Sequence, residues 1–156
     1  MKENPTLRKD EAYFIAEVNW DTCEKFKSVN PLYLTALQNA ESNFDKGATS
    51  SQGALGINQI WPPTGRLLCR SVGWEYSADI LKDVPRSTHL AVLYLDILST
   101  DYGANLENLA AAYNAGPKVL ETFVSNKTKA PKETIEYVKK VLTSYKEYET
   151  LLSKNL

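Results

Sequence analysis

The sequence predicts an all-α fold with one short turn-rich segment. Helix-start signals followed by apolar residues at helical spacing recur along most of the 156 residues. No run with strand-like alternation is long enough to predict a sheet. A chain of this length suits one domain, because about two thirds of its unfolded surface can be buried without a disulfide or a metal. Residues 1–156 are therefore expected to form a single α-helical domain.

The first two helices are expected over residues 10–28 and from Pro31 onward. Asn30 and Pro31 are a typical N-cap and first-turn pair for the second helix. Its inward-facing stripe is expected to consist of Leu34, Leu37, Ala40 and Phe44. This spacing puts Glu41 near the end of the helix, where the chain enters a polar loop.

Two further helices are expected after that loop. Pro62 and Pro63 start the third helix, and Gly73 stops it. The fourth helix is expected over residues 85–102, before Gly103. Its inward stripe is expected to consist of Leu90, Leu93, Tyr94, Ile97 and Leu98. A stripe of this length predicts that the fourth helix forms the centre of the core.

The last third of the chain predicts three more helices, which makes about seven in all. Asn105 caps a short Ala-rich helix that ends at Gly116, and Pro117 opens the next one. Residues 125–130 are expected to form a polar turn before Pro131 opens a long terminal helix. The buried side of this helix is expected to consist of Ile135, Val138, Val141, Leu142, Tyr145 and Tyr148.

The charge balance narrows the range of partners. The 18 lysines and arginines nearly match the 19 aspartates and glutamates, which argues against a nucleic-acid partner and against docking on an anionic membrane. No apolar run approaches the roughly 18 residues of a transmembrane span. The first residues, MKENPTLRKDE, lack the apolar core of a signal peptide. As written, the chain is expected to be soluble and to carry no export signal.

Few side chains in this sequence suit a metal. Cys23 and Cys69 are compatible with a disulfide or with two buried thiols, and their spacing does not decide between these alternatives. Together with His89, the only histidine, they fall short of the usual ligand set of a zinc site. His89 is expected to be a packed or surface residue of the fourth helix. No metal or other cofactor is expected.

The most informative segment covers residues 41–64, ESNFDKGATSSQGALGINQIWPPT. Its three glycines let the backbone turn tightly and approach a ligand closely. Leu55 to Ile60 is the one stretch that could pair as a short extended element. Glu41 opens onto this segment, which makes its carboxylic acid a candidate proton donor at the rim of a groove.

This segment resembles the soluble lytic transglycosylase (SLT) family, whose pattern runs E-S-x-F, A-x-S-x-x-G-A-x-G, then a Gln and Pro-x-Thr. The pattern is met by Glu41, Ser42, Phe44, Ala48, Ser50, Gly53, Ala54, Gly56, Gln59, Pro62 and Thr64. A second family motif, A-Y-N-A-G-P, occupies residues 112–117, and a third, E-T-x-x-Y-V, occupies residues 133–138. Three motifs in the family's order are a specific signal, and the match covers about residues 30–142.

The resemblance implies a lysozyme-like domain that acts on peptidoglycan glycan strands. Glu41 would protonate the β-1,4 glycosidic oxygen between N-acetylmuramic acid and N-acetylglucosamine, while the muramyl N-acetyl group stabilises the cationic centre. Deprotonated Glu41 would then accept the proton of the sugar's 6-hydroxyl, which closes a 1,6-anhydro ring. A single residue that serves as acid and then as base needs a pKa raised toward about 6 to 7, and burial is the usual cause.

The resemblance also carries over five substrate-binding residues, which are Ser50, Gln59, Tyr113, Asn114 and Tyr137. Ser50 would hydrogen-bond the sugar's N-acetyl group or the acid, or else cap its own loop. Gln59 would hold the substrate, or else support the loop. The two tyrosines would lie beside the acid, donate to its carboxylate and stack on a sugar. Asn114 is more readily assigned to the turn after the Ala-rich helix.

Two other functions stay open. A lysozyme-like hydrolase usually needs a second carboxylate, and Asp45 is the nearby candidate, although its place at the helix end favours a loop role. A non-catalytic glycan-binding module of an envelope or phage assembly would bind strands without cutting them, and the intact Glu41 argues against it.

The residues beside the family's glutamine depart from its usual pattern. Methionines commonly flank this glutamine, whereas here Asn58 precedes Gln59 and Trp61 follows Ile60. These changes are expected to alter the groove wall and hence the glycan preference. Tryptophans as a group are more often core residues, but Trp61 is well placed to line a glycan groove.

The resemblance implies that the protein acts in the periplasm or cell envelope, where peptidoglycan lies. The missing export signal conflicts with this, so either a leader was removed and Met1 added for expression, or the protein reaches the wall by phage lysis or injection. We favour the first explanation, because targeting segments are routinely removed. The expected partners are peptidoglycan strands and, as an open alternative, an envelope or secretion machine. The chain is expected to be a monomer.

Overall fold

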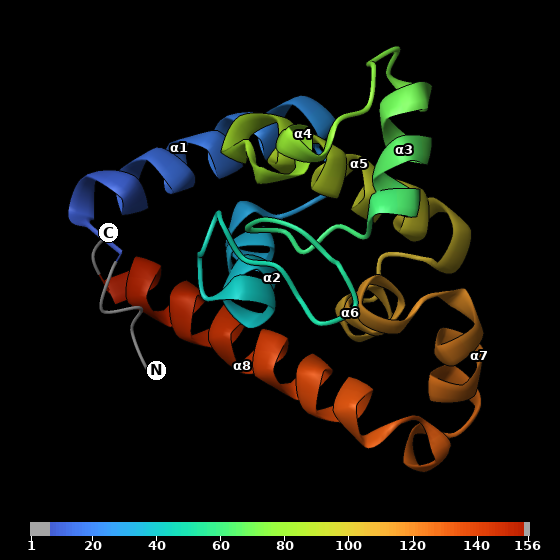
Figure 1. Ribbon diagram of the computed structural model, residues 1–156. Coiled ribbons are helices and arrows are strands. Elements are labelled where there is room, and N and C mark those ends of the chain that lie inside the picture. Colours follow the sequence, from blue (N-terminus) through green and yellow to red (C-terminus); the bar gives the residue numbers. More distant parts are fainter. Residues whose placement is uncertain (1–6, 155–156) are drawn as a thin grey trace.

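The computed structural model describes residues 7–154, which fold into eight α-helices and one 3₁₀ helix with no β-sheet in that range (Figure 1). The elements are α1 (Lys9–Phe26), α2 (Pro31–Ser42), α3 (Pro62–Ser71), α4 (Ala78–Lys82), α5 (Val84–Tyr102), α6 (Leu106–Ala115), α7 (Pro117–Ser125), η1 (Lys127–Lys129) and α8 (Lys132–Lys154). The expected all-α class is confirmed. Of the helices described, none is both long and apolar enough to cross a bilayer.

Side-chain caps fix several helix starts. Asn30 caps α2 and Asn105 caps α6, each by accepting a backbone N–H of the first turn, as the sequence predicts. A third cap on α5 was not expected. Asp83 accepts from Arg86 N at 3.0 Å, so that α5 begins at Val84.

Two short elements, α4 and η1, lie where the sequence gives no periodic signal. α4 has five residues, which are too few for a helical stripe to be recognised. Its Leu81 packs on α3, since a Cβ added to Gly65 would lie 3.0 Å from Leu81 Cδ2. η1 falls in the expected polar turn, where Asn126 accepts from Thr128 N at 3.0 Å. Tertiary contacts and a local cap therefore define these two elements.

The buried faces of α5 and α8 differ from the stripes that the spacing predicts. On α5, Val92 and Leu95 are fully buried, whereas Ile97 is 39% exposed. α5 packs against α1, α3, α4 and α6, so its buried arc is wider than a one-sided stripe. On α8, the expected core residue Ile135 is 36% exposed. The residues that α8 buries are Thr134, Tyr137, Val138, Val141 and Ser144.

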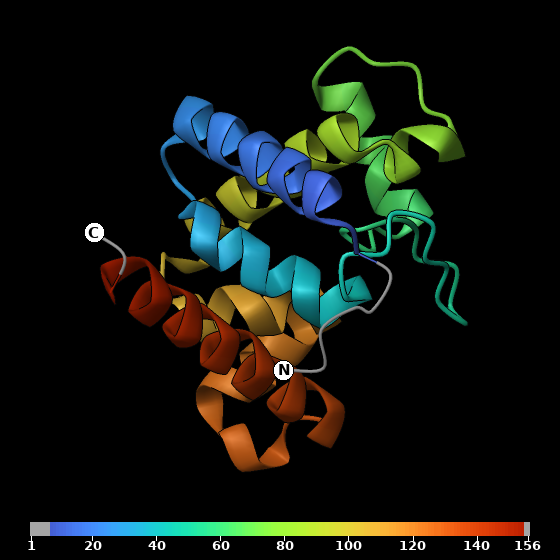
Figure 2. The ribbon, with the colours of Figure 1, turned by 90° about the vertical axis from the view of Figure 1, so that its left-hand side faces the viewer.

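α2 lies in the middle of the molecule. Figure 2 shows α1, α2 and α8 in layers, and α2 contacts both of the other helices. Its buried residues are Tyr33, Leu34, Ala36, Leu37, Gln38 and Asn39. The helix ends at Asn43, whose φ of 52° is left-handed. Because α2 is held from two sides, its C-terminal end is a fixed position for Glu41.

The loop after α2 is closed by isolated β-bridges. Thr49 pairs with Leu55, and Leu55 pairs with Ile60, both in the antiparallel sense. This agrees with the short extended element expected near Leu55. Gly56 brings the loop against α4, because a Cβ at this residue would lie 1.9 Å from Leu81 O.

The cysteines and the histidine are packed side chains. Cys23 and Cys69 are free and buried, which is the second of the two alternatives left open by the sequence. The ring of His89 lies between two aromatic rings, with centroid distances of 5.1 Å to both Phe26 and Trp74. Burial lowers the pKa of His89, and the nearby positive charge of Lys25 adds to this effect. These groups belong to the core and its edge.

Candidate functional site

Glu41 lies on the last turn of α2 and is held by α8. Tyr137 donates its phenolic hydrogen to Glu41 Oε1 at 2.6 Å. Lys140, one turn further along α8, donates to Ala40 O at 2.9 Å and to Asn39 O at 3.4 Å. Asn39 O also accepts from Asn43 N, whereas the bond to Ala40 O satisfies a carbonyl group at the end of α2, where intrahelical partners run out. α8 thus fixes both the carboxyl group of Glu41 and the helix end that carries it.

The surroundings of Glu41 favour the protonated form of its carboxyl group more than water does. Burial raises its pKa from the ordinary 4.5 to about 7. The hydrogen bond from Tyr137 and the positive charge of Lys140 act in the opposite direction, because both stabilise the carboxylate. Burial is the largest of the three effects. A pKa near neutrality lets one carboxyl group give up a proton and take it back, as the family resemblance implies for an acid that also serves as base.

Tyr113 of α6 lies near Glu41, but its hydroxyl donates elsewhere. The phenol donates to Asn58 O at 2.8 Å. Burial and then the carboxylate charge of Glu41 raise the pKa of Tyr113. The ring of Tyr94 packs beside it, with 5.5 Å between centroids. Of the two tyrosines expected to donate to the acid, Tyr137 therefore does so and Tyr113 does not.

Ser50 and Gln59 hydrogen-bond to their own loop. Ser50 Oγ accepts from Ala54 N at 3.0 Å. Gln59 Nε2 donates to Gly56 O at 2.8 Å and to Ala48 O at 3.4 Å. These are the loop-capping and loop-supporting contacts that were expected as the alternative role of each residue. Both side chains stabilise the conformation of the loop that follows Glu41.

Asn114 is half-buried near the C-terminal end of α6. The helix ends at Gly116, whose N–H donates to Ala112 O at 2.9 Å. Backbone groups thus close the turn to which Asn114 was assigned from the sequence.

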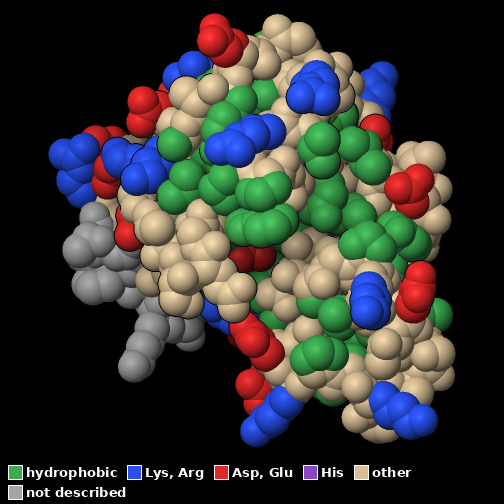
Figure 3. Space-filling view, turned by 45° about the vertical axis from the view of Figure 1, so that its right-hand side comes forward, with side chains coloured by type: hydrophobic (Ala, Val, Ile, Leu, Met, Phe, Trp, Pro, Cys, Tyr) green, Lys and Arg blue, Asp and Glu red, His purple; other side chains and the backbone are tan. Residues whose placement is uncertain are grey.

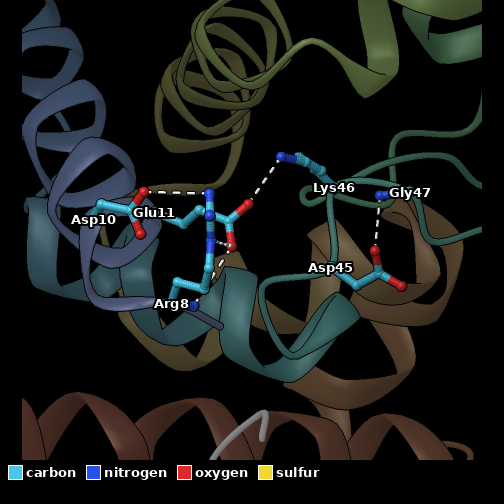
Figure 4. Close-up of polar contacts among 6 residues, drawn as sticks. All are labelled: Arg8, Asp10, Glu11, Asp45, Lys46 and Gly47. Carbon is cyan, nitrogen blue, oxygen red and sulfur yellow. Dashed lines mark hydrogen bonds and ion pairs between the residues drawn. The ribbon is translucent and has the colours of Figure 1, made fainter. Parts of the chain in front are cut away.

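Asp45, the nearest candidate for a second carboxylate, is an exposed loop residue. Its Oδ1 accepts from Gly47 N at 2.8 Å and closes a local turn (Figure 4). The neighbouring Lys46 forms an ion pair with Glu11 of α1, with 3.0 Å between Nζ and Oε1. These contacts give Asp45 the loop role that the sequence favours. Within residues 7–154, no three His, Cys, Asp or Glu side chains gather in a way that could hold a metal ion.

Apolar side chains surround a hollow on one face of the molecule. Figure 3 shows this hollow with apolar groups along its rim and an acidic side chain at its floor. Trp61, at the end of the loop and the start of α3, is 55% exposed, and so is Trp20 of α1. The expectation of a core residue is wrong for Trp20, whereas Trp74 packs on the core. Trp61 has the exposure that a groove-lining residue needs.

Three residues that shape the site carry no motif signal. Lys140 lies after the third motif, and only its position three residues after Tyr137, on the same helix face, points to the site. Gln38 has the same spacing before Glu41 on α2. Asn58 stands among apolar loop residues. A polar residue in an apolar setting is the signal that could have identified Gln38 and Asn58.

Comparisons with known proteins agree on one family. Residues 19–136 match the sequence profile described as the transglycosylase SLT domain. Membrane-bound lytic murein transglycosylase D of Escherichia coli K12 is 33% identical over 134 residues, which cover 79% of this chain and 29% of that protein.

Two solved structures are similar in fold. An inactive mutant of lytic transglycosylase Slt from Pseudomonas aeruginosa has a TM-score of 0.80 and 24% identity over 88% of this chain and 24% of that chain. The 70 kDa soluble lytic transglycosylase from Escherichia coli has a TM-score of 0.75 and 27% identity over 85% of this chain and 24% of that chain. This chain therefore spans less than a third of the length of each of these three proteins.

Proposed function

The chain belongs to the transglycosylase SLT domain family, and we propose that it is a lytic transglycosylase acting on peptidoglycan. It cleaves the β-1,4 bond between N-acetylmuramic acid and N-acetylglucosamine and forms 1,6-anhydro-N-acetylmuramic acid. The observation that carries this proposal is the buried carboxyl group of Glu41, whose pKa is about 7 and which accepts from Tyr137. A group that is half protonated near neutral pH suits a reaction that needs an acid first and a base afterwards.

Glu41 acts as the acid in the first half of the reaction. It transfers its proton to the glycosidic oxygen while the bond from that oxygen to the muramyl anomeric carbon breaks. The N-acetylglucosamine part leaves with a free hydroxyl group. The muramyl N-acetyl oxygen stabilises the positive charge at the anomeric carbon, as in substrate-assisted glycosidases. Asp45 is exposed and closes a local turn with Gly47, which supports a mechanism with a single carboxylate.

Glu41 acts as the base in the second half. Its carboxylate takes the proton of the muramyl 6-hydroxyl while that oxygen bonds to the anomeric carbon, which closes the anhydro ring and regenerates the acid. No water is consumed. Tyr137 and Lys140 stabilise the carboxylate that exists between the two halves, and burial favours the return of its proton.

The substrate-binding residues of this proposal are Ser50, Gln59, Tyr113, Asn114 and Tyr137. Ser50 and Gln59 act by holding the loop, because their hydrogen bonds are made to loop atoms. The tyrosine rings and Asn114 contact the sugars beside the reacting bond. Trp61 extends the groove wall at the far end of the loop.

The proposed substrate places the work of this protein in the periplasm or cell envelope. Delivery by a phage is the alternative. Residues 1–156 would act as one domain and as a monomer on glycan strands. Association with an envelope or secretion machine stays open. The two steps need no cofactor, because Glu41 moves both protons and the substrate supplies the nucleophile.

Mass spectrometry of the soluble products from purified peptidoglycan tests the proposal. The parent protein, Glu41→Gln and a control, Glu136→Gln, are compared. Glu136 is an exposed residue of α8 next to Tyr137, and its ion pair is with Lys132. Muropeptides lighter by one water than hydrolysis products are expected from the parent and the control, and none from Glu41→Gln.

Two other results would overturn the proposal. Hydrated reducing ends would identify a lysozyme-like hydrolase. Binding of the strands without release of any product would identify a glycan-binding module.

A further inference from the structure

A cavity of about 310 Å³ lies at the corner of the molecule where α7, η1 and α8 meet (Figure 1). It is separate from the groove of Glu41, because its lining contains none of the residues proposed to bind glycan strands. Val138 and Leu142 of α8 line the cavity, whereas Tyr137 faces a different side of this helix and holds Glu41. Small-molecule sites in proteins have volumes of roughly 300 to 1,000 Å³. The cavity is therefore large enough for a small ligand of its own.

The floor of the cavity is apolar. Phe123 of α7 and Val138 of α8 are buried core residues, and Leu142 packs against the same core cluster. Ile135, one turn before Val138, also lines the cavity and is partly exposed. Ile135, Val138 and Leu142 are three and four residues apart, so they lie along one side of α8. This side of α8 therefore keeps apolar surface open to the cavity.

Three lysines surround the apolar floor. The ammonium group of Lys127 on η1 lies over the ring of Phe123, 5.3 Å from its centroid. Lys139 and Lys146 line the cavity from α8 and are two helical turns apart. Glu107 of α6, which forms an ion pair with Lys127, is the one carboxylate among the described lining residues. Three positive charges and one negative charge give the lining a net charge of +2, although the whole chain has a formal net charge of −1.

The carboxylates of α8 nearest to these lysines in sequence belong to another groove. Glu136 and Glu147 line a groove between α8 and the C-terminal end of α2, and Glu136 also forms an ion pair with Lys132. Lys139 lies between the two grooves and lines both. The charge balance of the whole chain does not reveal this local excess of lysines, because it averages over all residues. The cavity thus presents a positive rim to a ligand.

An apolar floor beneath a positive rim selects the chemistry of the ligand. An alkyl chain gains free energy by leaving water for the floor, whereas the hydroxyl groups of a neutral sugar would lack partners there. The ammonium groups are compact point charges, which suit a carboxylate or a phosphate equally well. We propose that this cavity binds an amphiphilic anion, a molecule with one alkyl chain and one carboxylate or phosphate group. Such a ligand leaves the groove of Glu41 open, so the site is distinct from the proposed site of glycan cleavage.

The test is a titration of the full chain with hexanoate, heptanoate and octanoate as monomers, followed by NMR of ¹³C-labelled methyl groups. The methyl signals of Ile135, Val138 and Leu142 should shift with each ligand. Kd should fall by about fourfold for each methylene group added, because each one leaves water for the floor. Octyl phosphate should shift the same signals. Octyl glucoside has the same alkyl chain without the charge, so its Kd should be at least about threefold higher than that of octyl phosphate.

Charge variants test the rim, and they should act in opposite directions. Lys127→Met and Lys146→Met should each raise the Kd of octanoate about two- to fivefold, because each removes one ammonium group. Glu107→Gln should lower this Kd by a similar factor, because it removes the carboxylate that competes for Lys127. Lys82→Met is the control, since Lys82 is an exposed lysine of α4 that does not line the cavity. It should leave Kd unchanged.

A matched pair of isoleucines tests the floor. Ile135 is 36% exposed, and Ile97 of α5 is 39% exposed and does not line the cavity. Ile135→Glu should raise the Kd of octanoate at least about tenfold, because it places a carboxylate against the alkyl chain and repels the anionic group. Ile97→Glu should leave Kd unchanged. The Tm of both variants is measured as well, which separates a lost site from a lost fold.

Four results would each refute the site. Absence of any methyl shift would show that these anions do not bind, and equal affinity for octyl glucoside would show that the positive rim has no role. Equal affinity for inorganic phosphate and octyl phosphate would show that the floor has none. Binding to phosphatidylglycerol vesicles without binding of monomeric octanoate or octyl phosphate would identify a membrane-docking surface instead. These measurements need no turnover, so they stay decisive even if the parent protein forms no anhydro product.

Discussion

Tyr137 and Glu41 are 96 positions apart in the chain and are joined by a hydrogen bond of 2.6 Å. The bond connects α8 to the C-terminal end of α2 and opposes the effect of burial on the pKa of Glu41. Burial raises the pKa of Glu41, whereas Tyr137 and Lys140 lower it, and the result is about 7. Both the stability and the activity of the protein should therefore depend on the protonation of this carboxyl group near neutral pH.

Glu41→Gln should make the protein more stable than the parent at pH 8. The folded pKa of Glu41 is about 7 and the unfolded value is 4.5, so between these values the folded state binds more protons. The contribution of protonated Glu41 to the free energy of unfolding is fully present below pH 4.5 and is lost as the pH rises through 7. The loss is on the order of 1 to 3 kcal/mol, and the neutral amide avoids it. Urea unfolding at pH 5 and pH 8 measures the difference, and identical pH slopes for the two proteins would contradict it.

Lys140→Met should move the alkaline loss of activity to higher pH. The free enzyme needs protonated Glu41, so kcat/KM should fall above about pH 7. Removing the positive charge of Lys140 removes an interaction that favours the carboxylate, which raises the pKa of Glu41. Lys139→Met is the control, because its neighbouring ammonium group does not contribute to the pKa of Glu41. A profile of kcat/KM against pH checks the prediction, and equal shifts in both variants would refute it.

Local signals in the sequence are enough to place Glu41. The cap at Asn30, the apolar stripe and the glycine-containing loop fix where α2 begins and ends, and each of these signals spans only a few residues. The position of Tyr137 beside Glu41 was expected from the family resemblance. No local pattern relates two residues that lie 96 positions apart. Short-range signals therefore predict the helices, and the resemblance to a known family predicts which residues of different helices lie close together.

The choice of hydrogen-bond partners could not be predicted in this way. Tyr113 has one hydrogen to give, and the tertiary structure presents the carbonyl of Asn58 to it. Ser50 and Gln59 likewise find their partners in their own loop once it is folded. The exposure of Ile97 could not be predicted from its spacing either, because the buried face of α5 depends on which helices surround it.

Cys23 and Cys69 should behave as unreactive thiols. Burial raises the pKa of Cys23 to about 12 and also raises that of Cys69, so little thiolate is present at pH 8. A thiol reagent such as DTNB should therefore react slowly with the folded protein and rapidly with both thiols after unfolding in urea. A reductant should leave Tm unchanged. Unfolded protein that shows no reactive thiol until it is reduced would instead demonstrate a disulfide.

Gly56→Ala should destabilise the protein far more than Gly53→Ala, although both glycines have a positive φ, 73° and 83°. The left-handed backbone costs an alanine roughly 1 to 2 kcal/mol at either position. At Gly53 nothing lies within 4 Å of the added Cβ, whereas at Gly56 it would lie 1.9 Å from Leu81 O. A backbone atom cannot rotate away, so the loop must separate from α4 and expose apolar surface, at a total cost of about 3 kcal/mol or more. Thermal unfolding measures both variants, and equal losses of Tm would mean that the loop and α4 are not in close contact.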